Sequence, residues 1–157
     1  MTILSPRLRA LLDCLPLKDG MRVIEIGCGP GAAAREIVRR IGSGHVLAID
    51  RSDRAIALVR KASQAEIVSG RLSLRQVAAE QFELAPGEPP YDLALAIRVG
   101  ALDGRHPEAG KLVRRRIAAA LIPGGLLYID RGDRLHATRP EDGADRMSTA
   151  AGYEDLG

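Results

Sequence analysis

Apolar residues along the chain fall into blocks with two kinds of spacing. Continuous or alternating apolar blocks of about four to eight residues are typical of β-strands, and a helical period is typical of amphipathic helices. The first pattern predicts strands at residues 22–26, 45–49, 71–77, 92–99 and 126–129. The second predicts helices at residues 6–15, 32–41, 52–65 and 106–121, with a short helix or turn at residues 79–84.

Strands that alternate with helices through short turns predict an α/β fold, with an open parallel sheet flanked by helices and joined by right-handed crossovers. About five strands are expected, within one domain over residues 1–130 that opens with a helix in residues 1–19. Residues 131–157 are rich in Arg, Asp, Gly and Ala. We expect them to form a polar C-terminal tail, flexible or partly helical, rather than another strand and helix unit.

The composition is that of a cytoplasmic globular protein. Of 157 residues, 46% are hydrophobic and 27% are charged, which is ordinary for one soluble domain. The sequence contains no apolar run long enough to span a membrane and no signal-peptide pattern at its start. Its two cysteines, Cys14 and Cys28, are too few for a disulfide framework, so we expect reduced thiols in the cytoplasm.

The charge pattern bears on the class of partner. The positive charge comes almost entirely from arginines, which mostly alternate with acids and leave a net charge of +3. The one basic cluster, residues 114–116, lies in a helical pattern and is typical of a solvated helix face. Aromatic residues make up 3% of the chain, so bases would find few side chains to stack on. These features favour a small molecule over a nucleic acid.

A glycine-rich loop follows the first predicted strand. Residues 23–31 read VIEIGCGPG, in which an acid, Glu25, precedes glycines at 27, 29 and 31. Glycine accepts positive φ and lets a ligand lie against the backbone, and the helix behind the loop presents unpaired N–H groups. A tight turn alone needs one glycine, so three of them predict a ligand-binding loop.

Asp50 ends the second predicted strand. Ligands of open parallel sheets bind at the carboxyl ends of the strands, so Asp50 should face the same crevice as the glycine loop. A carboxylate there can accept hydrogen bonds from both hydroxyls of a ribose. Capping of the next helix is the simpler alternative, but the spacing from the glycines favours ribose binding.

Two ligand classes use such a loop. The spacing of Gly27, Gly29 and Ala32 can be written as a dinucleotide fingerprint, but the third glycine falls at Gly31 instead. Glu25 would also repel a pyrophosphate, whereas it suits a cation. These features favour a nucleoside with a positive group over a nicotinamide or flavin cofactor.

At this point the sequence resembles the class I S-adenosylmethionine-dependent methyltransferases. Residues 23–31 look like their first motif, and Asp50 falls where they hold the ribose. The segment YDLALA at residues 91–96 is similar to their fourth-strand motif, and LIPGGL at residues 121–126 is similar to their turn into the fifth strand. The resemblance covers roughly residues 20 to 130, and four motifs in the right order are more specific than one loop. It implies a Rossmann-like fold and S-adenosylmethionine as cofactor.

The resemblance also implies roles for particular residues. The glycine loop and Glu25 would hold the methionyl end of the cofactor, Asp50 its ribose, and the segments near Arg51 and Glu80 its adenine. Family members often carry an acid where this chain has Ala78, for which Glu80 is the candidate substitute. The cofactor-binding candidates are Glu25, Gly27, Cys28, Gly29, Gly31, Asp50, Arg51, Ala79, Glu80 and Arg98.

Methyl transfer from a sulfonium is an in-line displacement with a neutral leaving group, so the protein mainly aligns donor and acceptor and excludes water. A general base matters when the acceptor is a hydroxyl or a charged amine. Arg98 is placed to hold a substrate carboxylate or to shape the pocket. Asp103 is the best-placed base, although capping of the loop and helix would explain it too. We expect no metal site. Other candidates in these loops are Arg105, His106, Arg131, Asp133 and His136.

The family sheet usually ends in an antiparallel pair of sixth and seventh strands, for which residues 131–157 leave little room. We expect these strands to be reduced or absent, which would expose the fifth strand. A second subunit could cover it, and this predicts a homodimer.

Three functions stay open from the sequence. The leading hypothesis is a methyltransferase that uses S-adenosylmethionine and acts on a small molecule. The second is a non-catalytic cofactor-binding or partner subunit of a methyltransferase, suggested by the missing C-terminal strands and the absence of an obvious base. The third is an NAD-dependent oxidoreductase, which Glu25 and the glycine spacing disfavour.

Overall fold

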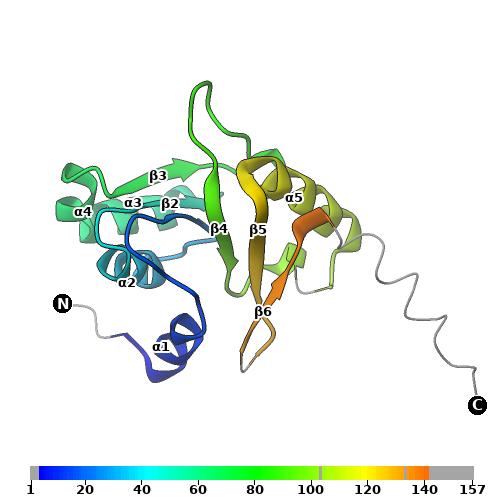
Figure 1. Cartoon of the computed structure of the whole chain (residues 1–157), viewed down its shortest axis with the longest axis horizontal. Coiled ribbons are helices and arrows are strands. Elements are labelled where there is room, and N and C mark those ends of the chain that lie inside the picture. The colour runs from blue at the N-terminus through cyan, green and yellow to red at the C-terminus, as the bar shows by residue number, and fades with distance from the viewer. Residues whose placement is uncertain (1–3, 103, 133, 142–157) are drawn as a thin grey trace, which may run out of the picture.

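The computed structural model describes residues 4–102, 104–132 and 134–141, and forms an α/β sandwich around one sheet (Figure 1). The strands are β1 (Arg22–Ile26), β2 (His45–Asp50), β3 (Leu72–Gln76), β4 (Tyr91–Ala96), β5 (Leu121–Asp130) and β6 (Leu135–Thr138). The helices are α1 (Pro6–Asp13), α2 (Ala32–Arg40), α3 (Asp53–Ala62), α4 (Gln64–Val68) and α5 (Pro107–Ala120), with short 3₁₀ turns η1 (Ala79–Gln81) and η2 (Gly100–Leu102).

The sheet has the order β3-β2-β1-β4-β5-β6. Strands β1 to β5 are parallel, and β6 runs antiparallel to β5. The order reverses between β1 and β4, which is where open α/β sheets bind their ligands. The predicted Rossmann-like class is therefore confirmed.

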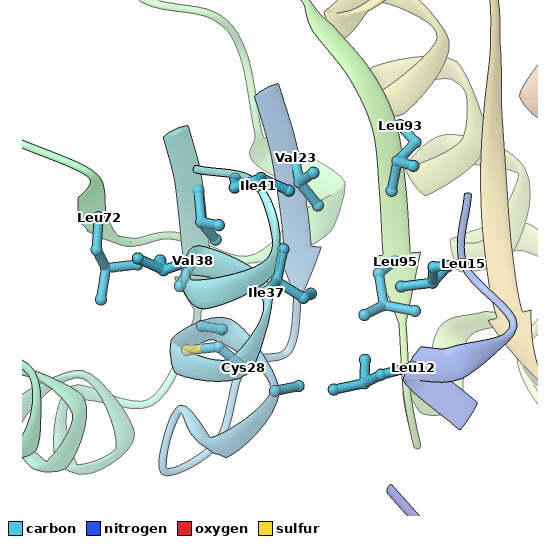
Figure 2. Close-up of a cluster of buried hydrophobic side chains, with 14 of the residues drawn as sticks. Leu12, Leu15, Val23, Cys28, Ile37, Val38, Ile41, Leu72, Leu93 and Leu95 are labelled. Carbon is cyan, nitrogen blue, oxygen red and sulfur yellow. The ribbon is translucent and has the colours of Figure 1, made fainter. Parts of the chain in front are cut away.

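Different helices cover the two faces of the sheet (Figure 1). Side chains alternate between the faces along each strand. In β4, Leu93 and Leu95 therefore join a core with α1, α2 and α3, whereas Ala94 and Ala96 join a core with α5. Burial on both faces explains why the central strands are continuous apolar runs. Figure 2 shows the first core, where labelled side chains of α1, α2, the segments just after these helices and the sheet meet: Leu12, Leu15, Ile37, Val38, Ile41, Val23, Leu93 and Leu95.

Serine hydroxyls begin two of the helices, as their sequences predict. The Ser5 hydroxyl accepts a hydrogen bond from the N–H of Leu8 at 3.2 Å, and Pro6 occupies the first turn of α1. The Ser52 hydroxyl accepts one from the N–H of Ala55 at 3.2 Å. The helix predicted at residues 52–65 instead divides at Ser63, a buried residue whose hydroxyl accepts a hydrogen bond from Arg35.

The fifth strand is longer than predicted. It starts at Leu121, which pairs with Tyr91 of β4, and includes Pro123, Gly124 and Gly125. The pairing with β4 shifts register between Tyr91 and Leu93. A Cβ on Gly125 would lie 3.1 Å from the carbonyl oxygen of Asp92, so the glycine permits a close approach of the two strands at this irregularity.

The structure corrects the prediction for the C-terminal region. Residues 135–138 form a sixth strand, so the sheet has six strands within the described residues rather than about five, and a plain polar tail is wrong for this segment. The sixth strand is short, in keeping with the predicted reduction. Residues 142–157 lie outside the described part. Among the described helices, none has the length and apolar character needed to cross a membrane.

Candidate active site

A cavity of about 940 Å³ opens at the carboxyl ends of the parallel strands. Its walls come from the glycine loop after β1, the ends of β2 and β3, the loop between β4 and α5, and the start of α1. Cavities of about 300–1,000 Å³ are typical of small-molecule sites, so this one has room for a nucleoside and a second molecule.

The glycine loop combines an open position with a tightly packed one. Gly29 has a φ of 52°, and a Cβ there would meet no described atom within 4 Å, so its backbone faces open space that a ligand can enter. Gly31 has a φ of 86°, and a Cβ there would lie 2.9 Å from both methyl groups of Val59. Gly31 does not line the cavity. The structure therefore places Gly31 as the turn into α2 packed against α3.

Asp50 connects the end of β2 to the glycine loop. One carboxylate oxygen accepts a hydrogen bond from the N–H of Gly29 at 3.0 Å, and the other accepts one from the N–H of Ser52 at 2.9 Å. The N–H of Cys28 also donates to the carbonyl of Ile49 at 3.0 Å. Each carboxylate oxygen keeps a lone pair for a further donor, so Asp50 can support the loop and still bind a ligand hydroxyl.

Glu25 is a buried acid on the cavity wall, with 3% of its surface exposed. Within the described part of the chain, its Oε2 atom has no hydrogen-bond partner. Burial raises the pKa of Glu25 to about 8; the charge of Asp50 adds to this, and a backbone hydrogen bond with Ala34 opposes it. The charge of Arg35 also opposes the rise. A buried carboxyl group with a free oxygen on the cavity wall suits a cationic ligand.

Cys28 is a packing residue of the loop. It belongs to the core shared with α2, and burial raises the pKa of its thiol to about 12. The nearby charges of Glu25 and Asp50 act in the same direction. Because the thiolate is the nucleophile, burial disfavours nucleophilic chemistry at Cys28.

The remaining residues that we predicted to bind the cofactor also face the cavity. Arg51, Ala79 and Glu80 line it on the side of β2 and β3, and Arg98 lines it at the end of β4. The structure therefore brings together nine of the ten predicted positions, with Gly31 as the exception.

The loop after β4 holds the acceptor-side candidates. Arg98, Arg105 and His106 line the cavity. Arg131 and His136 do not line it. Asp103 and Asp133 lie outside the described residues, so the role of Asp103 as a base stays a prediction.

The sequence missed the contribution of α1. Ser5, Arg7 and Leu8 line the cavity, and the Arg7 guanidinium donates to Asp130 at 2.9 Å and to the carbonyl of Gly132 at 2.8 Å. This ion pair fixes the start of α1 to the carboxyl end of β5. Its partners are 123 residues apart, and no local pattern signals such a pair.

Close packing of α5 supports the loop after β4. A Cβ on Gly110 would lie 2.5 Å from the carbonyl oxygen of Ala101, which belongs to this loop. Alanine usually stabilises a helix interior relative to glycine by about 1 kcal/mol. We expect Gly110→Ala to lower the free energy of unfolding instead, by about 1–3 kcal/mol, because of overpacking. Urea unfolding measures this change, and a stabilised variant would contradict it.

Comparison with known proteins agrees with this geometry. A family model described as "Methyltransferase domain" matches residues 23–125, which hold the glycine loop, Asp50 and Arg98. This chain belongs to the methyltransferase family. The class I interpretation is confirmed. The Glu25 carboxyl group is buried with no hydrogen-bond partner for Oε2 among the described residues, and the half-buried Gly29 faces open space, which fits a cationic nucleoside.

Curated methyltransferases are similar over most of this chain. Trans-aconitate 2-methyltransferase of Delftia acidovorans is 31% identical over 129 residues, covering 82% of this chain and 44% of that protein. The enzyme of that name from Methylobacterium nodulans is 32% identical over 127 residues, covering 80% and 43%. The chain thus spans less than half the length of these relatives. Coclaurine N-methyltransferase bound to N-methylheliamine and SAH has a TM-score of 0.64 at 21% identity, covering 78% and 34% of the two chains, and shows the shared fold.

Proposed function

We propose that this methyltransferase chain binds S-adenosylmethionine across its glycine loop and transfers the methyl group to a small molecule. The observation that carries the proposal is the Glu25 carboxyl group, which is buried on the cavity wall without a hydrogen-bond partner for Oε2 among the described residues. Such a group favours a cationic ligand and disfavours the pyrophosphate of NAD.

The donor would lie along the glycine loop between β1 and β2. Asp50 would accept hydrogen bonds from the ribose hydroxyls, and Glu25 would face the cationic methionyl end. Arg51, Ala79 and Glu80 would flank the adenine, since they line the cavity beside β2 and β3. The rest of the cavity, beside β4 and α1, then holds the acceptor.

For methyl transfer, the protein must align the methyl donor with the acceptor and exclude water. The loop held by Asp50 fixes the donor, and the start of α1 closes the cavity above the end of β5 through the pair of Arg7 with Asp130. Arg98 would contact the acceptor or the donor near the methyl group. Asp103 would act as base for an acceptor that carries a proton.

The two relatives from Delftia acidovorans and Methylobacterium nodulans are named for methyl transfer to trans-aconitate, which supports a small-molecule acceptor.

Calorimetry with S-adenosylmethionine, S-adenosylhomocysteine and NAD⁺ tests the proposal. We expect the first two ligands to bind and NAD⁺ to fail. Binding of NAD⁺ alone would contradict the proposal. Turnover of the methyl donor against a panel of small metabolites then separates an enzyme from a non-catalytic subunit.

Strand β6 pairs with β5, so the predicted exposure of the fifth strand is wrong. We propose instead a homodimer formed at the edge of β6. Its two central residues, His136 and Ala137, are exposed, and among the strands of the described residues β6 is at the edge of the sheet. An open strand edge is a site for pairing with another chain. Sedimentation at micromolar protein concentration tests this, and a monomer would contradict it.

We also propose a cytoplasmic location. Cys14 is exposed and Cys28 is buried, and both thiols are free, which suits a reducing compartment. Fractionation of cells that express the protein would test this location.

A further inference from the structure

The ionisable side chains around the cavity are separated by sign. Glu25, Asp50 and Glu80 lie on β1, at the end of β2 and after β3, and therefore on one side of the cavity. Arg98, Arg105 and His106 lie between β4 and α5, on the other side. Arg51 departs from this division, since it follows Asp50, and its side chain is exposed.

Arg98 is the most unusual of the basic residues. Its φ of 57° is in the left-handed region, which no other described residue except glycine occupies. Backbone strain of this kind is concentrated at functional sites. Within the described part of the chain, the Arg98 guanidinium makes no hydrogen bond or ion pair, although it lines the cavity. By contrast, Arg7 and Arg116 both pair with acids.

We infer that the methyl acceptor is a small carboxylic acid whose carboxylate is bound by Arg98. This inference rests on the proposed donor site beside Glu25 and Asp50. With the cationic donor held by acids on one wall, an unpaired guanidinium on the other wall attracts a carboxylate and repels a protonated amine. The planar guanidinium also matches a carboxylate through two parallel hydrogen bonds.

The reaction of a carboxylate balances without a base. A lone pair of a carboxylate oxygen attacks the methyl carbon, and the C–S bond breaks with its electron pair moving to sulfur. The sulfonium becomes a neutral thioether, and the carboxylate becomes a neutral methyl ester. No proton is released, because the nucleophile is already ionised at neutral pH. A hydroxyl or ammonium acceptor would release one proton per turnover.

Binding of acids to the protein saturated with S-adenosylhomocysteine tests the inference first. We expect calorimetry to detect succinate and citrate, and to detect no binding of succinamide, which has the skeleton of succinate without its charges. Arg98→Gln should weaken the binding of these acids by about 10-fold or more, and Arg98→Lys by less. Arg115→Gln, which changes an exposed arginine of α5 outside this cavity, should leave the binding of these acids unchanged. Equal binding to the wild-type protein and Arg98→Gln, or no binding of either acid, would overturn the inference.

Turnover with tritiated methyl donor gives a second readout. A methyl ester releases volatile methanol in alkali, and its formation in weak buffer leaves the pH unchanged. An alkali-stable product formed from an amine, a hydroxyl compound or a phosphate ester would overturn the inference and leave the proposed function intact. Failure of S-adenosylhomocysteine to bind at the first step would instead count against the proposed function.

Discussion

Substituting alanine for Asp50 should weaken the binding of S-adenosylmethionine by about 100-fold or more. The carboxylate is placed to accept hydrogen bonds from two ribose hydroxyls, and a hydrogen bond to a charged group contributes about 1.5–3 kcal/mol. The same change removes the acceptors for the N–H groups of Gly29 and Ser52, so the glycine loop also loses its support from β2.

Two further variants identify the cause of the weaker binding of S-adenosylmethionine. Asp50→Asn keeps the shape and one acceptor, so it should retain more affinity than alanine. Asp53→Ala removes an exposed acid at the start of α3 that does not line the cavity, and we expect unchanged affinity. Calorimetry at constant pH measures all three dissociation constants. An Asp50→Ala protein that stays folded and binds the donor as the wild-type protein does would exclude the ribose role.

Most of the sheet follows from patterns that the sequence displays locally. The central strands are buried on both faces, so they form apolar runs that are easy to recognise. The sixth strand lacks such a pattern. Leu135 is its one buried residue, so four residues of mixed character looked like part of a polar segment.

The donor side of the site could be predicted because its residues are close in sequence or end a recognisable strand. Glycine spacing identified the loop, although it could not separate Gly29, which faces the cavity, from Gly31, which packs against Val59. The pair of Arg7 with Asp130 depends on tertiary packing. The left-handed backbone of Arg98 was equally hidden, because nothing about an arginine signals positive φ.

Glu25→Gln should remove a large part of the pH dependence of stability. The pKa of Glu25 is about 8 in the folded protein against an ordinary value of 4.5, so the folded state retains a proton that the unfolded state has lost. The stabilisation is complete below pH 4.5 and declines as the pH rises to about 8. Between pH 5 and pH 8, this group should lower the free energy of unfolding by about 3 kcal/mol. Urea unfolding at both pH values should show this loss in the wild-type protein relative to Glu25→Gln, and parallel pH profiles would contradict it.

Donor binding should reverse the protonation of the same group. A cationic ligand beside Glu25 favours the carboxylate, so at pH 7, below the pKa of about 8, binding must displace a proton from the free protein. We expect release of close to one proton per donor bound, and an affinity that rises from pH 6 toward pH 8. Glu25→Gln, which has no proton to lose, should release none and should bind the donor about 10- to 100-fold more weakly. Calorimetry in buffers of different ionisation enthalpy counts the protons. Equal proton release by the two proteins would place the cationic end of the donor away from Glu25.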